Sequence, residues 1–446
     1  MAAELTHEFL NESFEAFEAE PRFKLARNTV TSTEWGPALM DRSHVQSLNH
    51  VFSKRLPDAK ICNQKSSGRC WLFACSTLMR RALQKKYNLD PDFELSQTYL
   101  FFWDKLEKCN WCLENVIATA DEPVDSRLVQ YILTDPTCDG GQWEMIVNVV
   151  EKYGVVPKNV YGEFISSELS AHLNVFLKSK LREFAEELRS LHASGIEIES
   201  IRARKAEMMQ VIHRILIIHL GTPPTKFDFS VQDKEKKHVY FPDLTPQAFY
   251  AEHVPVKVSE MVSIVNDPRH DYDITMTVDK LGNVVGGKRV FYINTPIDAL
   301  WKYAKTTIDN DLPVWFGCDV GKASSLKKLG IMSTKLYDFD LAFGTTLGQD
   351  KAGRLRHKES EMTHAMVFTG YNVKPDEEKP DKWRVENSWG TERGDSGYDV
   401  MTADWFDEHM YQVVVDKASL TPEHLALLEA NDPIVLPAWD PMGSLA

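Results

Sequence analysis

Apolar residues recur at helical spacing in several segments of the chain, and the longest of these define the expected architecture. Residues 70–87 predict a helix whose last two turns are rich in lysine and arginine, where a helix favours positive charge. A shorter helix is expected over residues 142–153, because a glycine and a proline follow it. Residues 169–192 and 201–220 carry two further apolar stripes separated by Gly195, which predicts a helical hairpin.

The second half of the chain has the pattern of buried strands with polar groups at their ends. Residues 296–309 predict a helix, and residues 313–320 predict a buried strand. Two further stretches, H-A-M-V-F-T-G-Y and R-V-E-N-S-W-G, each resemble a strand. The first would present His364 at its start, and the second would present Asn387 at its end.

Both ends of the chain have distinctive patterns. Leu5, Phe9, Phe14 and Phe17 form a loose helical stripe, so the N-terminal arm is expected to pack on another surface. Residues 435–446, V-L-P-A-W-D-P-M-G-S-L-A, are apolar and interrupted by proline and glycine. This composition favours an extended, docked segment over a helix.

Composition limits the class of protein. A chain of 446 residues with 43% apolar residues can bury a large core. The formal net charge of −14 opposes contact with phosphates, so nucleic-acid binding is not expected. No apolar run is long enough to span a bilayer, and the start of the chain lacks a hydrophobic signal core. Seven cysteines without a framework spacing predict a reduced, cytoplasmic protein. The lack of a spanning apolar run predicts that it does not contact a membrane.

The run N-Q-K-S-S-G-R-C-W places Gln64 six residues before Cys70, at the start of the first predicted helix. A helix N-terminus favours a thiolate, and the glutamine amide can donate to a developing oxyanion. Taken alone, Cys70 could equally be a buried structural cysteine. Together with His364 and Asn387 it supplies a nucleophile, a base and an orienting amide, which are the parts of a thiol-protease triad.

Other candidate motifs carry no chemistry of their own. Cys109 and Cys112 form a C-x-x-C pair, but a zinc ribbon needs a second pair, which the chain lacks. The flanking residues continue a helical pattern, so we interpret both as structural thiols. The histidines are scattered and no glycine-rich phosphate loop occurs, so neither a metal nor another cofactor is expected.

These motifs resemble the active-site signatures of papain-like cysteine peptidases. Gln64 and Cys70 stand at the family's spacing, and N-S-W-G followed by Gly397-Tyr398 is similar to its asparagine motif. The run C-D-G-G at residues 138–141 resembles the family's C-N-G-G. Further blocks, including Y-L-F-F-W-D-K, V-W-F-G-C-D-V-G-K and the C-terminal P-A-W-D-P-M-G-S-L-A, are similar to the subfamily of cytosolic cysteine aminopeptidases.

The resemblance implies an α+β, two-lobed fold with a helical lobe and a β-barrel-like lobe. His364 follows Cys70 by 294 residues, which exceeds the roughly 130 to 150 of simpler members and indicates an insertion. The expected parts are a 1–60 N-terminal extension, a 61–160 helical lobe with the nucleophile, a 161–290 largely helical insertion, a 291–434 β lobe with the histidine and asparagine, and a 435–446 tail in the active-site cleft.

The resemblance also implies an activity, a cysteine aminopeptidase that removes N-terminal amino acids from peptides and related amides through a thioester acyl-enzyme. Cys70 would be the nucleophile, His364 the base, Asn387 its orienting partner, and Gln64 an oxyanion donor. The substrate-binding residues would be Gly140, Gly141, Trp389 and Ala446. A papain-like endopeptidase or acyltransferase with the same triad is the alternative, and a structural or nucleic-acid-associated assembly with a vestigial site is disfavoured by the intact triad.

Three further expectations come from the resemblance. The α-carboxylate of Ala446 would pair with the free amino group of a substrate, so the protein's own tail would restrict its activity. Six copies would form a homohexamer whose active sites face an internal channel. Ser67 replaces a cysteine that secreted relatives bond to the cysteine of C-N-G-G, which leaves Cys138 free and fits a reducing compartment. The physiological substrate, and whether Ala446 is an encoded or a self-trimmed end, stay open.

Overall fold

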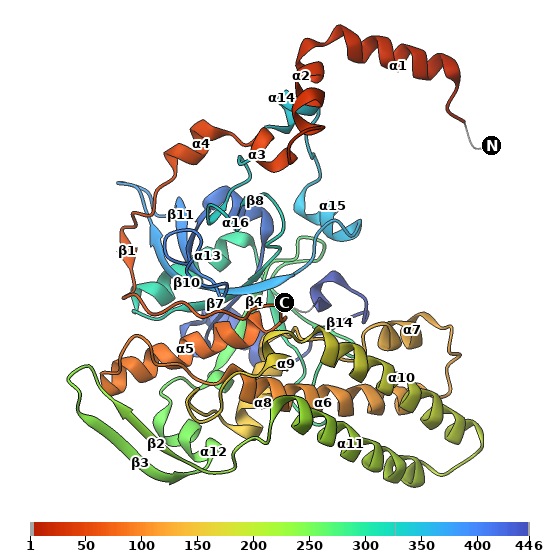
Figure 1. Cartoon of the computed structure of the whole chain (residues 1–446), viewed down its shortest axis with the longest axis vertical. Helices are drawn as coiled ribbons and strands as arrows, with labels where there is room; N and C mark the ends of the chain where they lie inside the picture. Colours follow the sequence, from red (N-terminus) through yellow and green to blue (C-terminus); the bar gives the residue numbers. More distant parts are fainter. Residues whose placement is uncertain (1–3, 326, 445–446) are drawn as a thin grey trace.

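The computed structural model describes residues 4–325 and 327–444. Helices form one end of the molecule, a large mixed sheet lies beside them, and a helical N-terminal arm extends from the opposite end (Figure 1). The predicted α+β class is therefore confirmed. Helix α5 (Cys70–Tyr87) lies along the boundary between helices and sheet, because one of its faces packs against strands β7 (Val314–Cys318) and β10 (His364–Asn372).

The helices predicted from apolar spacing are present. Helix α5 spans the predicted residues, and α8 (Trp143–Tyr153) begins one residue after the expected start. The predicted hairpin is formed by α10 (Ala171–Ala193) and α11 (Ile198–Leu220), which pack on each other and on α6 (Gln97–Ala118). Shorter helices in this part are α7 (Arg127–Thr134), α9 (Ile165–Glu168) and α12 (Pro246–Ala248).

The main sheet has the strand order β14-β5-β6-β4-β13-β7-β10-β11-β12-β9-β8, with β1 also paired to β10. The remaining strands are β1 (Lys54–Arg55), β4 (Met261–Val265), β5 (Ile274–Val278), β6 (Tyr292–Asn294), β8 (Ser324–Ser325), β9 (Ile331–Met332), β11 (Lys382–Glu386), β12 (Tyr398–Thr402), β13 (Met410–Asp416) and β14 (Ile434–Leu436). A separate hairpin consists of β2 (Phe227–Gln232) and β3 (His238–Leu244). Helices α13 (Ile297–Asp309), α14 (Phe339–Phe343), α15 (Lys351–Arg356), α16 (Ala403–His409) and α17 (Pro422–Ala430) accompany the sheet.

Strands β4 and β5 of the main sheet lie inside the segment expected to be a largely helical insertion, residues 161–290. Strand β4 pairs with β13, and β5 joins the sheet through β6. Helical spacing does not reveal these strands, because M-V-S-I-V and I-T-M-T-V are short runs of mostly buried residues.

Strand register brings the two polar strand ends together. Strand β10 runs antiparallel to β11, with Val367 opposite Glu386. The start of β10 therefore lies beside the residue that follows β11, and His364 and Asn387 occupy these two positions. Both residues are at least 96% buried.

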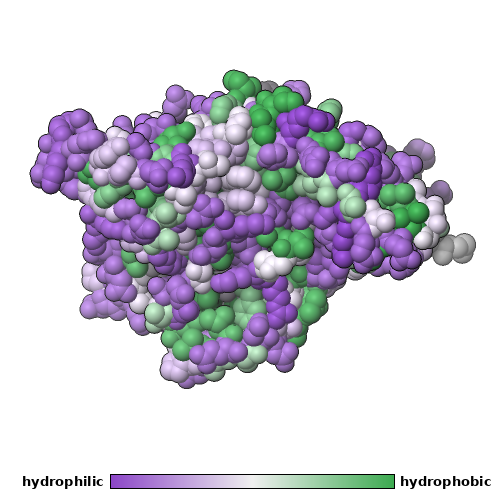
Figure 2. Space-filling view, turned by 90° about the horizontal axis from the view of Figure 1, so that it is seen from below, coloured by the Kyte–Doolittle hydropathy of each residue, from purple (hydrophilic) through white to green (hydrophobic). Residues whose placement is uncertain are grey.

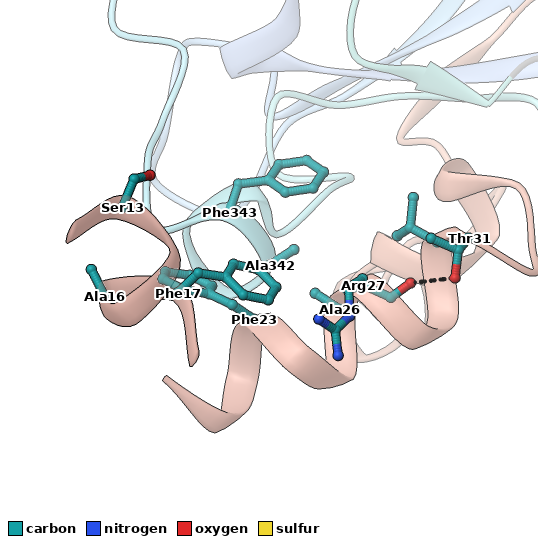
Figure 3. Close-up of a pocket in the computed structure, with 10 residues that line it drawn as sticks. Ser13, Ala16, Phe17, Phe23, Ala26, Arg27, Thr31, Ala342 and Phe343 are labelled. Carbon is teal, nitrogen blue, oxygen red and sulfur yellow. Dashed lines mark hydrogen bonds between the residues drawn. The ribbon is translucent and has the colours of Figure 1, made fainter. Parts of the chain in front are cut away.

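The N-terminal arm consists of α1 (His7–Ala19), α2 (Pro21–Val30), α3 (Trp35–Leu39) and α4 (Arg42–Ser47). None of the residues of α1 is buried, and the helix projects away from the rest of the chain (Figure 1). Helices α1, α2 and α14 border an open pocket of about 500 Å³. Figure 3 shows Phe17, Phe23 and Phe343 among the side chains that line it. Phe17 of the arm stacks on Phe23 of α2, as packing of the arm requires, whereas Phe9 and Phe14 of α1 are exposed in the single chain.

The C-terminal segment differs from the extended strand that was expected. Strand β14 ends at Leu436, and a 3₁₀ turn follows over Pro441–Gly443. The Asp440 side chain caps this turn by accepting a hydrogen bond from the Met442 backbone at 2.9 Å. Proline has no backbone N–H to continue a ladder, so Pro437 ends the strand.

Among the described residues, no helix has the length and apolar character needed to cross a membrane. Figure 2 shows polar residues over much of the lower face of the molecule, with apolar residues gathered in separate patches between them.

Candidate active site

Cys70 occupies the first turn of α5, where backbone N–H groups have no partner within the helix. Its side chain is 2% exposed. The backbone N–H of Ala365 lowers the pKa of the thiol, which indicates that the start of β10 approaches it. Ala365 directly follows His364, and the helix that carries Cys70 packs on β10.

His364 and Asn387 form the hydrogen bond expected of a base and its orienting amide. His364 Nε2 lies 3.0 Å from Asn387 Oδ1, and an amide oxygen can only accept, so Nε2 carries the hydrogen. The Trp389 ring lies 4.7 Å from the His364 ring, measured between centroids, and covers it from one side. The other ring nitrogen, Nδ1, takes no part in this hydrogen bond.

The segment that carries Gln64 is tied directly to the asparagine motif. The Gln64 backbone N–H donates to the Ser388 carbonyl at 2.8 Å, and the Ser388 hydroxyl donates to Gln64 Oε1 at 2.6 Å. Gln64 Nε2 donates one hydrogen to the Ser67 carbonyl at 2.5 Å. An amide nitrogen has a second hydrogen, which suits the predicted role of oxyanion donor.

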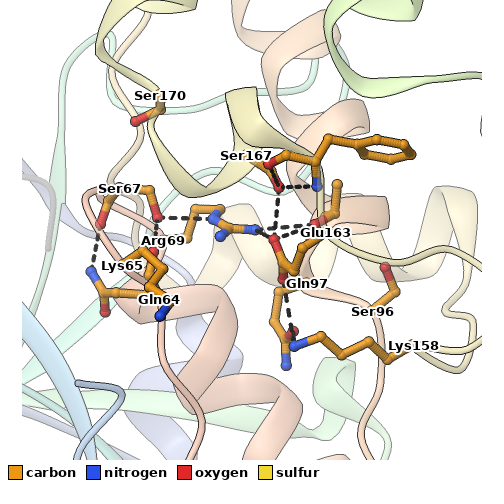
Figure 4. A network of polar contacts seen from close by, with 12 residues as sticks. Gln64, Lys65, Ser67, Arg69, Ser96, Gln97, Lys158, Glu163, Ser167 and Ser170 are labelled. Carbon is orange, nitrogen blue, oxygen red and sulfur yellow. Dashed lines mark hydrogen bonds and ion pairs between the residues drawn. The ribbon is translucent and has the colours of Figure 1, made fainter. Parts of the chain in front are cut away.

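A buried arginine anchors the loop between Gln64 and Cys70 (Figure 4). The Arg69 side chain is fully buried, and its Nε donates to the Ser67 hydroxyl at 2.9 Å. Its Nη1 donates to Glu163 at 2.9 Å and to Thr98 at 3.1 Å. Ser67 is thus part of a polar network, and all seven cysteines are free.

Gly140 and Gly141 lie directly beside the nucleophile loop. Asp139 accepts a hydrogen bond from the Gly68 backbone at 3.1 Å, and its own carbonyl accepts one from the Trp71 indole at 2.7 Å. A Cβ atom at Gly141 would come within 2.6 Å of the Trp71 ring. Gly141 is therefore required for packing on Trp71 as well as for the predicted approach of a substrate backbone.

Asp139 holds the loop before Cys70 in place through its hydrogen bonds to Gly68 and Trp71. The C-D-G-G motif contains Asp139, but the motif alone does not predict this role. Its carboxylate also pairs with Lys105 at 2.7 Å and accepts from Asn174 of the α10–α11 hairpin at 2.8 Å. Burial opposes its charge, but Lys105 and the hydrogen bonds hold the pKa of Asp139 well below its usual range. The Asp139 carboxylate thereby connects three segments. These are the loop before Cys70, the residues Gly140 and Gly141 that follow Asp139, and the α10–α11 hairpin.

The C-terminal segment lies in the same region. Gln142 Nε2, one residue after the glycines, donates to the Ser444 carbonyl at 2.6 Å. The Ser444 hydroxyl donates to Glu361 at 2.6 Å, three residues before His364. Asp440 pairs with Arg269 at 2.7 Å, which fixes the segment upstream. Ala446, the predicted partner of the substrate amine, lies outside the described residues.

Burial disfavours charge on both central groups. It raises the pKa of the Cys70 thiol to about 11, and nearby backbone N–H groups oppose that rise. Burial lowers the pKa of His364 to about 4, while the Asn387 hydrogen bond raises this pKa and the charge of Arg393 lowers it. Proton transfer from the thiol to the imidazole would create both charges at once, and the attraction between opposite charges favours that transfer.

The C-x-x-C pair lies in surroundings that fit two structural thiols. Cys109 and Cys112 lie inside α6 and are buried, and burial raises the pKa of the Cys109 thiol to about 12. Across residues 4–325 and 327–444, no group of three or more His, Cys, Asp or Glu side chains could hold a metal ion.

Comparison with known proteins adds independent information. A family model described as "Peptidase C1-like family" matches residues 4–443. Bleomycin hydrolase from Rattus norvegicus is 47% identical over 438 residues, covering 96% of each chain. Aminopeptidase C from Streptococcus thermophilus is 45% identical over 444 residues, covering 99% of each chain. The crystal structure of PepW from Lactobacillus rhamnosis has a TM-score of 0.97 and 42% identity over the full length of both chains.

Proposed function

The chain belongs to the Peptidase C1-like family and is a papain-like cysteine aminopeptidase, and from this premise we propose the residues that perform and restrict the reaction. Cys70 is the nucleophile, His364 the general base and acid, Asn387 its orienting partner and Gln64 an oxyanion donor. The observation that carries this assignment is the 3.0 Å contact between His364 and Asn387 at strand ends beside the buried thiol of Cys70.

The reaction proceeds through a thioester. His364 holds the proton of the Cys70 thiol, which makes the resting pair a thiolate and an imidazolium. As the thiolate attacks the scissile carbonyl carbon, the carbonyl oxygen gains a negative charge. Gln64 Nε2 and the Cys70 backbone N–H donate to that oxyanion, each contributing about 3 kcal/mol in comparable sites. His364 then gives the proton to the leaving amine as the C–N bond breaks. Water, deprotonated by His364, cleaves the thioester and restores the thiol.

Two glycines and one tryptophan complete the proposed substrate site. Gly140 and Gly141 present backbone groups to the substrate at a distance that larger residues would not allow. Trp389 covers the hydrogen bond between His364 and Asn387 and protects it from water, which strengthens it by lowering the local dielectric constant.

We propose that the C-terminal segment converts this peptidase into an aminopeptidase. The contact of Ser444 with Gln142 supports a path along the substrate-binding glycines. The carboxylate of Ala446 then ends near Cys70 and pairs with the α-ammonium of the substrate. A longer substrate would collide with the segment, and an acylated amine would lose the ion pair.

The test compares an aminoacyl arylamide with its N-acetylated form. We expect kcat/KM to favour the free amine by on the order of 100-fold, because a buried ion pair that loses one partner costs about 2 to 5 kcal/mol. Equal values for the two substrates would contradict the aminopeptidase mechanism and favour the endopeptidase alternative.

We also propose that the protein assembles as a homohexamer, as the resemblance implies. Phe9 and Phe14 of α1 are 52% and 67% exposed, and a second copy would cover such a face. Light scattering should therefore give the mass of six 51.0-kDa chains, and Phe14→Asp should lower it without unfolding the chain. A wild-type monomer at micromolar concentration would contradict the assembly.

The compartment and partners follow from the same premise. We propose a cytoplasmic location, because seven free cysteines suit a reducing environment. The substrates are peptides and aminoacyl amides with a free amino terminus, and the acidic net charge of −14 gives no support for nucleic acid.

A further inference from the structure

A buried ion pair lies behind the predicted base and its orienting amide. Asp399, in β12, is fully buried, and Arg393 is 7% exposed. Arg393 Nη1 lies 3.1 Å from each oxygen of the Asp399 carboxylate, and Nη2 makes an additional close contact with Oδ2. A guanidinium that donates to both carboxylate oxygens holds the carboxylate in one orientation.

This carboxylate contacts the triad directly. Asn387 Nδ2 donates to Asp399 Oδ2 at 3.3 Å, while Asn387 Oδ1 faces His364. An ionised carboxylate only accepts hydrogen bonds, so it requires the amide nitrogen on its own side. The amide oxygen then faces His364, where it also accepts a hydrogen bond from the Ser388 backbone N–H at 2.7 Å. This orientation places the hydrogen on Nε2 and leaves Nδ1 for the thiol.

The backbone around Asp399 is shaped to hold a carboxylate. Gly330 and Gly394 both adopt positive φ, at 66° and 54°. A Cβ atom at Gly330 would come within 2.7 Å of Asp399 Oδ1, and one at Gly394 within 3.1 Å of the same oxygen. Two glycine backbones therefore close around the carboxylate where side chains would exclude it.

We propose that Asp399 is a positioning residue for the peptidase reaction, because its carboxylate, held by Arg393, locks the Asn387 amide and thereby selects the protonated nitrogen of His364. This inference rests on the proposed roles of His364 and Asn387. Nothing in the sequence near Asp399 marks it, since its proximity to Asn387 arises from the pairing of β11 with β12.

The charges around this carboxylate determine how its removal would alter the pH profile. Burial raises the pKa of Asp399 to about 6 while Arg393 opposes the rise, so the group is ionised at neutral pH and above. Among the described residues, Arg393 is the cation that faces it, and Glu386 on the neighbouring strand is engaged by Arg80 at 2.6 Å. Without the Asp399 charge, Arg393 would be left uncompensated and would lower the pKa of His364 further.

The experiment compares Asp399→Asn with the double variant Asp399→Asn/Arg393→Gln in the full-length protein. Activity is expressed per active thiol, titrated with iodoacetamide, across the pH range. For Asp399→Asn we expect kcat to fall by about tenfold with little change in KM. The Asn387 amide would then be held mainly at its oxygen, by the Ser388 backbone N–H, and would orient His364 less firmly. The alkaline limb should move to lower pH, since the imidazolium loses its proton more readily.

The double variant separates orientation from charge. It should recover the position of the alkaline limb, because the uncompensated arginine is gone, but it should keep the lowered kcat. Asp58→Asn is the matched control, since it breaks another ion pair of a buried arginine, Arg384, at 2.6 Å without contacting the triad. It should lower thermal stability while kcat and the pH profile stay at the wild-type values.

Two results would overturn parts of this account separately. If Asp399→Asn unfolds more easily but retains the wild-type kcat per thiol and the wild-type pH profile, the ion pair is structural only and the inference is wrong. If wild-type protein fails to hydrolyse the aminoacyl substrate in the same assay, the proposed function itself fails.

Discussion

Cys70→Ala should reduce kcat/KM for an aminoacyl arylamide by on the order of 10⁵-fold or more, because no other group replaces the sulfur that forms the thioester. The fold should survive, since removing one sulfur from a core of this size costs about 1 kcal/mol. Steady-state hydrolysis together with thermal unfolding would measure both effects.

Cys75→Ala provides the matched control for this prediction. Cys75 lies on the same helix, is fully buried and faces the apolar core, where burial raises the pKa of its thiol far above its usual range. Its loss should leave hydrolysis unchanged. Near-normal turnover by Cys70→Ala would show that another residue is the nucleophile.

Deletion of residues 443–446 should change the substrate preference more than any single substitution in the segment. The preference for a free over an acetylated amine should fall by on the order of 100-fold, because both the ion pair and the obstruction are removed. Hydrolysis of N-blocked or internal peptide bonds should appear at the same time. The ratio of kcat/KM values for the paired substrates is the measurement.

Two single substitutions test the role of the C-terminal segment in case the deletion variant misfolds. Asp440→Asn weakens the contact with Arg269 that anchors the segment, so it should give a partial loss of the preference. Asp432→Asn changes an exposed charge upstream of the cleft and should have no effect. If the truncated enzyme is folded and still requires a free amino terminus, the segment does not restrict the activity.

Local pattern predicts elements well where an element has its own apolar face. Helix α5 was predicted over its full length, because its apolar spacing is regular. Strands β4 and β5 were missed, because five-residue buried runs carry no period that separates them from other apolar segments. The stripe of α1 was recognised, but a stripe does not reveal whether its partner belongs to the same chain.

The site residues also differ in whether a local sequence motif marks them. Gln64, Cys70, His364 and Asn387 stand in local motifs, and the structure brings them together through one helix start and two strand ends. Asp399 could not be predicted, because it contacts Asn387 only through strand pairing and the turn that carries Arg393. The sequence offers no local signal for a contact of that kind.

The wide separation of the catalytic residues along the chain has a consequence for biosynthesis. A ribosome that has made the Cys70 helix has produced no peptidase, because His364 and Asn387 are still untranslated. Ser444 follows Asn387 by only 57 residues (444 − 387), which is about 3 to 12 s at ordinary translation rates. If the C-terminal segment narrows the cleft as proposed, it is thus delivered almost together with the proposed base, His364. A nascent chain then has little time to digest its neighbours.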